Sequence, residues 1–146
     1  MRPRLLGFVR GKNSMPVIDE LFAKLRVSGR KAFMPFITAG DPDLEFTHQL
    51  LRELDILGCT LFELGIPYSD PIADGPVIQA SYTRALKRQI ALSDILDMTS
   101  QVTSEIKAPL VTMVSYAIVY RFGLERYVAA AKQAGAVGAI IPDLLI

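Results

Sequence analysis

The chain has 146 residues, enough for one domain with a hydrophobic core but too few for two. Hydrophobic residues make up 51% of the sequence and charged residues 21%, which excludes a disordered chain and indicates a globular protein. A net charge of +1 gives no reason to expect nucleic acid as a partner, and no apolar run approaches the roughly 18 residues of a membrane-spanning helix.

The first 14 residues carry four basic side chains and no acid. Their apolar core, Leu5 to Val9, is shorter than the roughly 7–15 residues of a secretory signal. We therefore expect residues 1–14 to be a flexible tail, or the product of a start upstream of Met15; an organelle transit peptide is the alternative. A single Cys and a single His exclude a disulfide framework, argue against a metal site and make a reducing cytoplasm the simplest location.

After this tail, the sequence predicts helices that alternate with short apolar strands. A helix is expected from Ser14–Pro16 to Gly29, and Asp41 is expected to cap a second helix that Pro42 opens. The four expected strands cover residues 32–38, 60–65, 110–115 and 137–141. The later helices are expected at about 76–87, 93–107 and 123–134, with Pro76 opening the first and Ser93 capping the second.

Apolar strands separated by helices predict a parallel sheet, either doubly wound or closed into a barrel. No G-x-G-x-x-G follows a strand, which removes the main reason to choose a dinucleotide-binding sheet. Asp41, Glu63, Asp74 and Asp143 lie at or just beyond the carboxyl ends of strands, where barrel enzymes assemble their sites. We therefore expect an α/β barrel with sequential strands and helices on its outer face, although doubly wound sheets use the same edge.

One acid lies inside the second strand, in the stretch FELGIPYSDPIADGP that begins at Phe62. Because side chains alternate along a strand, Glu63 and Gly65 share one face and the large apolar residues share the other. Glu63 is thus expected to point into the barrel, beside a glycine that leaves room for a ligand. Burial would raise its pKa toward neutrality and suit it to acid–base chemistry. A glutamate tied to a basic neighbour or to backbone amides is the equal alternative.

The loop after this strand carries two further acids, Asp70 and Asp74. Pro67 and Pro71 restrict this loop, which cannot be a plain helix. Asp74 directly precedes a Gly-Pro pair at a helix start. It therefore either serves the site or only caps the next helix.

The run FELGIPYSDPIADGPVIQ resembles the signature of the tryptophan synthase alpha subunit family and departs from it only at Phe62, where an aliphatic residue is usual. FMPFITAGDPD (33–43) resembles the family's first strand and turn, and GAIIPDL (138–144) its fourth strand. The resemblance spans about residues 15–146 and implies a TIM (β/α)₈ barrel. Because a full barrel takes roughly 250 residues, we expect this chain to hold only its N-terminal half.

The resemblance implies a lyase of tryptophan biosynthesis that cleaves indole-3-glycerol phosphate to indole and glyceraldehyde 3-phosphate. By the matching positions, Glu63 is the catalytic acid–base residue that protonates the indole ring carbon. Asp74 matches the catalytic aspartate that binds the indole N–H, and we expect it to stay ionised in its polar loop. Phe36 and Thr38 match substrate-binding residues of the first strand.

The resemblance also implies a partner, because the family works in an alpha2-beta2 complex. Pro67 and Asp70 match a loop that closes over the site and touches the beta subunit. Pyridoxal phosphate belongs to that beta subunit, so no cofactor is expected in this chain. These residues are therefore the expected partner interface.

The sequence departs from the family pattern in two places. Where the family often reads M-x-Y-x-N-P, this chain reads MVSYAI, so Ser115 replaces the usual tyrosine and we transfer no substrate contact to Tyr116. The chain also ends before the loops that commonly bind phosphate on such barrels, so we expect the fragment to be inactive alone. The alternatives are another phosphosugar lyase or isomerase, and a non-catalytic half-barrel that binds a beta subunit or itself.

Overall fold

The computed structural model describes residues 4–7, 16–71 and 74–144. The elements run in the order β1 (Arg4–Gly7), α1 (Val17–Ser28), β2 (Phe36–Thr38), α2 (Leu44–Ile56), β3 (Phe62–Gly65), α3 (Pro76–Leu86), α4 (Leu92–Thr103), β4 (Leu110–Met113), α5 (Tyr116–Phe122), α6 (Leu124–Gln133) and β5 (Gly138–Ile141). None of the helices in this described part is long and apolar enough to cross a membrane.

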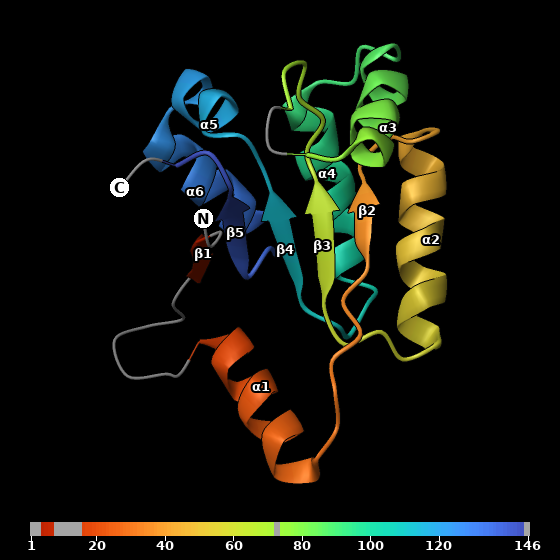
Figure 1. Ribbon diagram of the computed structural model, residues 1–146, viewed down its shortest axis with the longest axis vertical. Helices are drawn as coiled ribbons and strands as arrows, with labels where there is room; N and C mark the ends of the chain where they lie inside the picture. The colour runs from red at the N-terminus through yellow and green to blue at the C-terminus, as the bar shows by residue number, and fades with distance from the viewer. Residues whose placement is uncertain (1–3, 8–15, 72–73, 145–146) are drawn as a thin grey trace.

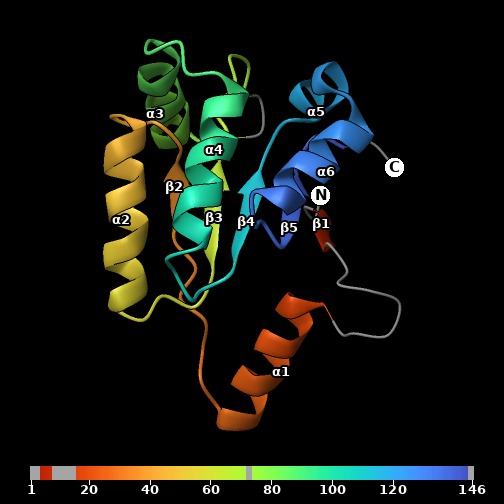
Figure 2. The ribbon, with the colours of Figure 1, turned by 180° about the vertical axis from the view of Figure 1, so that it is seen from behind.

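The strands form one sheet in the order β1-β5-β4-β3-β2, and the pairs among β2, β3, β4 and β5 are parallel. Figures 1 and 2 show α2, α4 and α6 together on one side of this sheet. The predicted sequential order of four parallel strands is therefore confirmed. Sequential parallel strands with their connecting helices on one face are the arrangement of a barrel rather than of a doubly wound sheet.

The main core lies between the sheet and these helices. Phe62 and Leu64 of β3 are fully buried in it, together with Leu51 of α2, Val102 of α4 and Tyr127 of α6. Phe62 and Leu64 alternate along β3 with residues of the opposite face, which explains why the apolar run of this strand is interrupted at every second position. The other face of β3 is left for the remaining side chains, which include the candidate site.

Helix α1 is an exception to the expectation that helices pack only on the outer face. Ile18 of α1 forms a second buried cluster with Leu61 and Val111, which precede or lie within strands β3 and β4. Figure 1 shows α1 beyond the amino ends of the strands. Because Leu61 alternates with the core residue Phe62, α1 covers the amino end of the inner face.

The amino-terminal head is not wholly the flexible tail that we expected. Arg4–Gly7 forms β1, which pairs antiparallel with β5 from Arg4 opposite Ile141 to Gly7 opposite Gly138. An edge strand offers unpaired N–H and C=O groups, which form hydrogen bonds with an extended segment that lies beside them. The rest of the head lies outside the described residues.

Two predicted helix starts were wrong. Asp43, not Asp41, caps α2, and its Oδ1 accepts a hydrogen bond of 2.8 Å from the Phe46 N–H. Helix α4 starts after Ala91, whose N–H donates to the Asp94 carboxylate over 3.0 Å, so Ser93 lies inside the helix. In both cases the capping role falls to the residue whose backbone is extended just before the first turn.

The predicted strand ends also shift. Of residues 32–38 only Phe36–Thr38 form β2, and β4 ends at Met113 rather than Ser115. Ser115 instead caps the short helix α5, which the sequence did not predict, and accepts a hydrogen bond from the Ala117 N–H over 3.2 Å.

Candidate active site at the carboxyl ends of the strands

The strand register brings the predicted site residues together on one face of the sheet. Phe36 of β2 lies opposite Glu63 of β3, and Thr38 lies opposite Gly65. Leu64, between the two β3 residues, is fully buried in the core under the helices. Because side chains alternate along a strand, Glu63 faces the inner side, as the sequence predicted.

Glu63 lies in a desolvated environment. Its side chain is half-buried, and burial, the one cause of the shift, raises the pKa of its carboxyl group. A salt bridge to a basic neighbour would have lowered this pKa instead. Among the described residues no salt bridge holds the Glu63 carboxylate, so the alternative of a basic partner is not supported, and the catalytic role of Glu63 stays a prediction.

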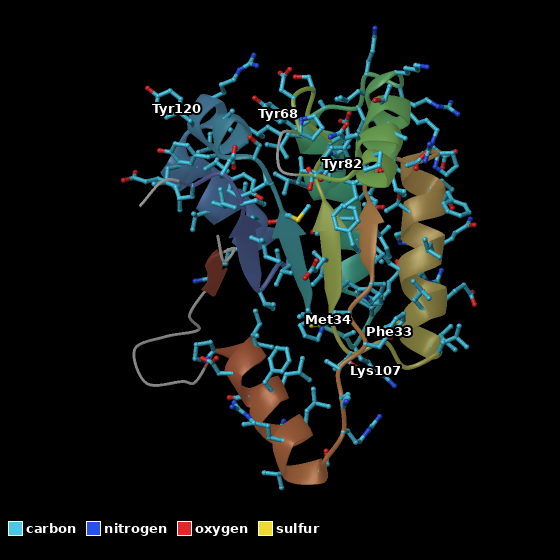
Figure 3. All side chains as sticks on the ribbon, in the orientation of Figure 1. Phe33, Met34, Tyr68, Tyr82, Lys107 and Tyr120 are labelled. Carbon is cyan, nitrogen blue, oxygen red and sulfur yellow. The ribbon has the colours of Figure 1, made fainter. Side chains whose placement is uncertain are left out.

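Gly65 does not leave open room for a ligand, contrary to our expectation. A Cβ at this position would overlap the ring of Phe36 and would lie 3.0 Å from the hydroxyl oxygen of Tyr82 in α3. The two rings have centroids 6.4 Å apart and an interplanar angle of 48°. The missing side chain thus allows an aromatic pair to pack over the carboxyl end of β3, where Figure 3 shows Tyr82.

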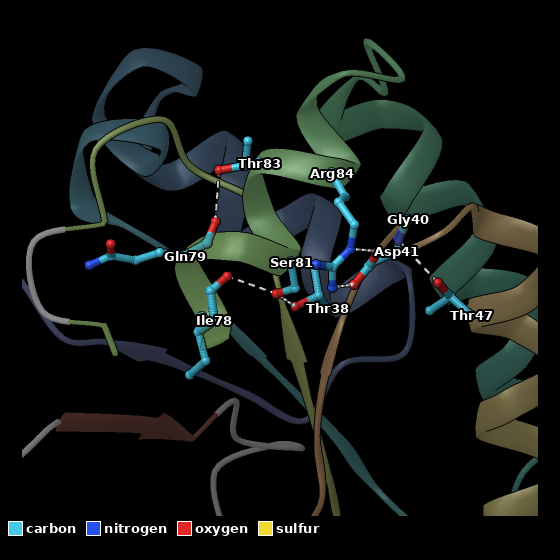
Figure 4. A network of polar contacts seen from close by, with 9 residues as sticks. All are labelled: Thr38, Gly40, Asp41, Thr47, Ile78, Gln79, Ser81, Thr83 and Arg84. Atoms are coloured by element: carbon cyan, nitrogen blue, oxygen red, sulfur yellow. Dashed lines mark hydrogen bonds and ion pairs between the residues drawn. The ribbon is translucent and has the colours of Figure 1, made fainter. Parts of the chain in front are cut away.

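Thr38 is buried, and its hydroxyl is engaged with helix α3. Its Oγ1 lies 2.6 Å from Oγ of Ser81, and the Ser81 hydroxyl donates to the carbonyl of Ile78 over 2.7 Å (Figure 4). Since the single Ser81 proton is used there, Thr38 is the donor of the pair. Its hydroxyl therefore ties β2 to α3, and its substrate contact stays a prediction.

Asp74 does not cap helix α3, which was the simpler alternative for this residue. The N-cap is Gly75, and no side chain makes a cap hydrogen bond there. The Asp74 backbone is held instead by α3 and by its own loop: its carbonyl accepts a 2.8 Å hydrogen bond from Nε2 of Gln79, and its N–H donates to the Pro71 carbonyl over 3.3 Å. This leaves the Asp74 carboxylate available to the site.

The surroundings of Asp74 are less polar than its loop sequence suggested. Burial, and to a lesser extent the negative charge of Asp143, raise the pKa of its carboxyl group. Both effects disfavour the ionised form. The prediction that a polar loop keeps Asp74 readily ionised thus missed the opposing influence of its neighbours.

Asp143 and the two residues that depart from the family pattern form one capping cluster. Ser115 Oγ donates to Asp143 Oδ2 over 2.7 Å, and the Tyr116 N–H donates to Oδ1 over 2.7 Å. The Asp143 carboxylate thus stabilises the start of α5. The Tyr116 ring packs against Tyr120 at a centroid distance of 6.2 Å.

Asp41 has a structural partner. Its carboxylate forms two hydrogen bonds with the Arg84 guanidinium, of 2.9 and 2.6 Å, and so joins the loop after β2 to α3 (Figure 4). In the same loop the Gly40 N–H donates to Thr47 Oγ1 over 3.0 Å. The Arg84 contacts hold α3 to the loop after β2, and the Thr47 contact joins the same loop to α2.

The loop after β3 is accessible at the same edge. Pro67 is half-buried and Asp70 is exposed, with a 2.8 Å hydrogen bond from Ser69 Oγ to the Asp70 carboxylate. Figure 3 shows Tyr68 of this loop beyond the carboxyl end of the sheet. The predicted role of this loop as a partner interface stays a prediction.

The opposite end of the sheet contains a separate cavity of about 410 Å³. It is lined by residues of α1, of the end of α2 and of the segments before β3 and β4, including Leu21, Arg30, Asp55 and Lys107. Lys107 lies at the amino ends of the strands (Figure 3), so the cavity is remote from Glu63. Among the described residues, no group of three or more His, Cys, Asp or Glu side chains is placed to hold a metal ion.

Sequence reasoning did not identify two residues that adjoin Asp74 and Gly65. Gln79 lies within the quoted signature, and that position was the only available signal. Tyr82 carried no signal, because its proximity to Gly65 depends on how α3 folds back over the sheet.

A family model described as tryptophan synthase alpha chain matches residues 22–145. The tryptophan synthase alpha chains of Rhodopirellula baltica and Microcystis aeruginosa are 50% identical over 135 residues and 48% identical over 130 residues, respectively. These alignments cover 90% and 89% of this chain and 49% of each relative. The chain thus spans about half the length of the curated relatives it matches.

Solved structures give the same picture. Tryptophan synthase subunit alpha from Legionella pneumophila superposes with a TM-score of 0.85 at 39% identity, over 90% of this chain and 50% of that one. Mycobacterium tuberculosis tryptophan synthase gives a TM-score of 0.85 at 29% identity, over 90% and 51% of the two chains. The predicted fold, half of an eight-stranded α/β barrel, is confirmed.

Proposed function

The chain belongs to the tryptophan synthase alpha chain family, and from this premise we propose that it supplies the acid–base part of a lyase site. The proposed reaction is the cleavage of indole-3-glycerol phosphate to indole and glyceraldehyde 3-phosphate. The observation that supports it best is the position of Glu63, inward-facing in β3 two residues before the strand's carboxyl end, with a pKa raised by burial. A carboxyl group whose pKa is raised keeps its proton to a higher pH and is better suited both to donate and to accept one.

Glu63 would act first as an acid and then as a base. It gives a proton to the indole ring carbon that bears the glycerol side chain, which leaves positive charge on the ring. The Glu63 carboxylate, now unprotonated, then acts as the base and removes the proton of the neighbouring hydroxyl. The carbon–carbon bond breaks, and its electron pair returns to the ring. Indole leaves, and the former alcohol carbon becomes the aldehyde of the second product.

Asp74 would stabilise the charge that appears in this sequence. Its carboxylate accepts the indole N–H, and the interaction strengthens as the ring becomes positive. Burial and Asp143 raise the pKa of free Asp74, and a positive charge on the ring would offset both effects. Asp74 would thus favour the charged intermediate over the neutral substrate.

The aromatic pair beside Glu63 suits a flat, apolar substrate. Phe36 lies next to Glu63 in the sheet register and packs against Tyr82, so one wall of the site is aromatic. We propose that Phe36 contacts the indole ring. Thr38 would contribute to the shape of the pocket, since its hydroxyl is bonded to Ser81.

The same premise supports a partner, which we propose to be a beta subunit in an alpha2-beta2 complex. The exposed Asp70 and the neighbouring Pro67 would contact it, and pyridoxal phosphate would belong to that subunit. The groups that this chain brings to the cleavage are carboxylates and need no cofactor. A cytoplasmic location belongs to the proposal, because a small-molecule substrate and a lone Cys59 require no oxidising compartment.

A chimaeric protein would test this function. Residues 1–146 are joined to the remaining half of the Rhodopirellula baltica alpha chain, which is 50% identical over the shared part. We expect the folded chimaera, mixed with a beta subunit, to release indole from indole-3-glycerol phosphate. The unaltered relative is the positive control, and circular dichroism verifies folding. A folded chimaera without activity beside an active relative would contradict the proposal. The 146-residue chain assayed alone is expected to release none, because the phosphate site is expected in the other half.

A further inference from the structure

Helix α3 starts shortly after Asp74, and the side chain of Gln79 in this helix reaches back to that residue. We propose that Gln79 is a positioning residue: its side-chain amide holds the Asp74 backbone and so directs the Asp74 carboxylate toward the site. The consequence for catalysis rests on the proposed lyase function, in which Asp74 stabilises charge on the substrate ring. The structural part concerns Gln79 and the loop alone and is tested without any activity.

Two hydrogen bonds join the Gln79 side chain to the loop. Its Nε2 donates to the Asp74 carbonyl over 2.8 Å and to the Pro71 carbonyl over 3.4 Å. An amide nitrogen carries two N–H groups, so one side chain can serve both acceptors. The Pro71 carbonyl also accepts a hydrogen bond from the Asp74 N–H over 3.3 Å. Both backbone polar groups of Asp74 are thus held, and the shorter of the two Gln79 bonds is the one that reaches this residue.

The Gln79 amide is carried by a regular part of α3. The Gln79 N–H donates to the Gly75 carbonyl over 3.0 Å, and the Gln79 carbonyl accepts a hydrogen bond from the Thr83 hydroxyl over 2.8 Å (Figure 4). Gln79 is exposed, so its side chain is not part of the core. Ordering an exposed glutamine costs rotamer entropy, which its hydrogen bonds to the loop must offset. The side chain therefore acts on the loop and not on the interior of the protein.

Helix α3 is in turn fixed to the sheet by two contacts that follow Gln79 in the chain. Ser81 shares a 2.6 Å hydrogen bond with Thr38 of β2, and the Arg84 guanidinium forms its two hydrogen bonds with Asp41 in the loop after β2 (Figure 4). Hydrogen bonds thus continue from β2 through α3 to the loop after β3. This connection defines where that loop lies relative to the sheet.

The direction of the Asp74 carboxylate depends on the backbone that carries it. Among the described residues, the hydrogen bonds of Asp74 are made by its N–H and its carbonyl, and none is made by its side chain. Two side-chain torsions separate the carboxylate from the backbone, so a displaced backbone carries the carboxylate with it. Because a group that stabilises developing charge must be placed accurately before the reaction, loss of the Gln79 amide would weaken the action of Asp74.

The structural part is tested on the 146-residue chain with Gln79→Met, which keeps the side-chain length and the helix propensity but removes the donor. We expect the carbonyl carbon-13 NMR signal of Asp74 to move upfield and its amide hydrogen to exchange faster, because the loop opens more readily. Gln133→Met, at an exposed glutamine that ends α6, is the matched control and should leave both unchanged. An unaltered Asp74 carbonyl signal and exchange rate in Gln79→Met would overturn the inference.

The catalytic consequence is tested in the chimaera with a double-mutant cycle. Gln79→Met is expected to lower kcat for indole release by about 3- to 10-fold with a smaller change in KM. In an Asp74→Ala chimaera the same substitution should change kcat by less than about twofold, because Gln79 acts through Asp74. Equal losses in the two backgrounds, or no loss with Asp74 present, would contradict the positioning role. If the chimaera with both residues intact is inactive, the lyase proposal fails, while the NMR result still decides whether Gln79 holds Asp74.

Discussion

Phe36 and Glu63 are register partners on neighbouring parallel strands, so a half-buried aromatic ring lies beside the carboxylate that the site depends on. The strand pairing that holds the sheet together thus also affects the chemistry of Glu63. It places an apolar side chain where it excludes water from the Glu63 carboxylate. The raised pKa of Glu63 follows from burial and needs no charged neighbour.

Replacing Phe36 with Ala should therefore lower the pKa of Glu63 toward its ordinary value. Water would enter the space left by the ring and stabilise the charged carboxylate. Carbon-13 NMR titration of Glu63 measures the change, and Phe36→Leu, which keeps an apolar side chain, should alter the pKa less. An equal or higher pKa in the Ala variant would show that Phe36 does not desolvate Glu63.

Gly65 should be intolerant of even the smallest side chain. The Cβ of Gly65→Ala would overlap the Phe36 ring and crowd the Tyr82 hydroxyl, so we expect the free energy of unfolding to fall by about 1–3 kcal/mol. Gly75→Ala is the matched control, because a Cβ there meets no atom within 4 Å. Urea denaturation gives both values. Similar losses at the two glycines would mean that the aromatic pair does not restrict position 65.

The two raised carboxyl pKa values also predict how stability depends on pH. A carboxyl group whose pKa is higher in the folded state binds its proton more tightly there, so its contribution to stability falls as pH rises from the unfolded to the folded pKa. Glu63→Gln and Asp74→Asn should each reduce this fall between about pH 4 and pH 7. Urea denaturation of both variants and the parent chain at the two pH values tests this. A steeper loss of stability in the variants would reverse the sign and contradict the assigned environments.

Features of the fold that depend on the local periodicity of apolar residues were predicted correctly from the sequence. Alternation along residues 61–65 was enough to place Glu63 on the inner face, and apolar runs between helices were enough for the sequential parallel sheet. The prediction failed where a contact with a residue far along the chain determines the structure. Asp41 looked like a helix cap, but Arg84, far along the chain, binds its carboxylate. Likewise β1 exists because β5, near the other end of the sequence, offers it an edge.

The residues of the candidate site likewise fall into those with a local sequence signal and those that only tertiary contacts bring to the site. Local signals, an acid in an apolar strand and an acid before a Gly-Pro pair, made Glu63 and Asp74 candidates, and the family resemblance supplied their roles, which stay predictions. Tyr82 was not found, because a tyrosine in a helix is ordinary and only the folded chain brings it to Gly65. The open space expected beside Glu63 was likewise a tertiary question, and the Phe36 ring occupies it.

Indole release by the chimaera with Glu63 replaced by Gln tests the central claim most directly. Glutamine keeps the shape and removes the titrating proton, so substrate binding should persist while turnover falls on the order of 10²- to 10⁴-fold. Tyr120→Phe in the same chimaera controls for changes remote from the site. If the Gln variant retains more than about a tenth of the parent activity, Glu63 is not the acid–base residue and the account is contradicted.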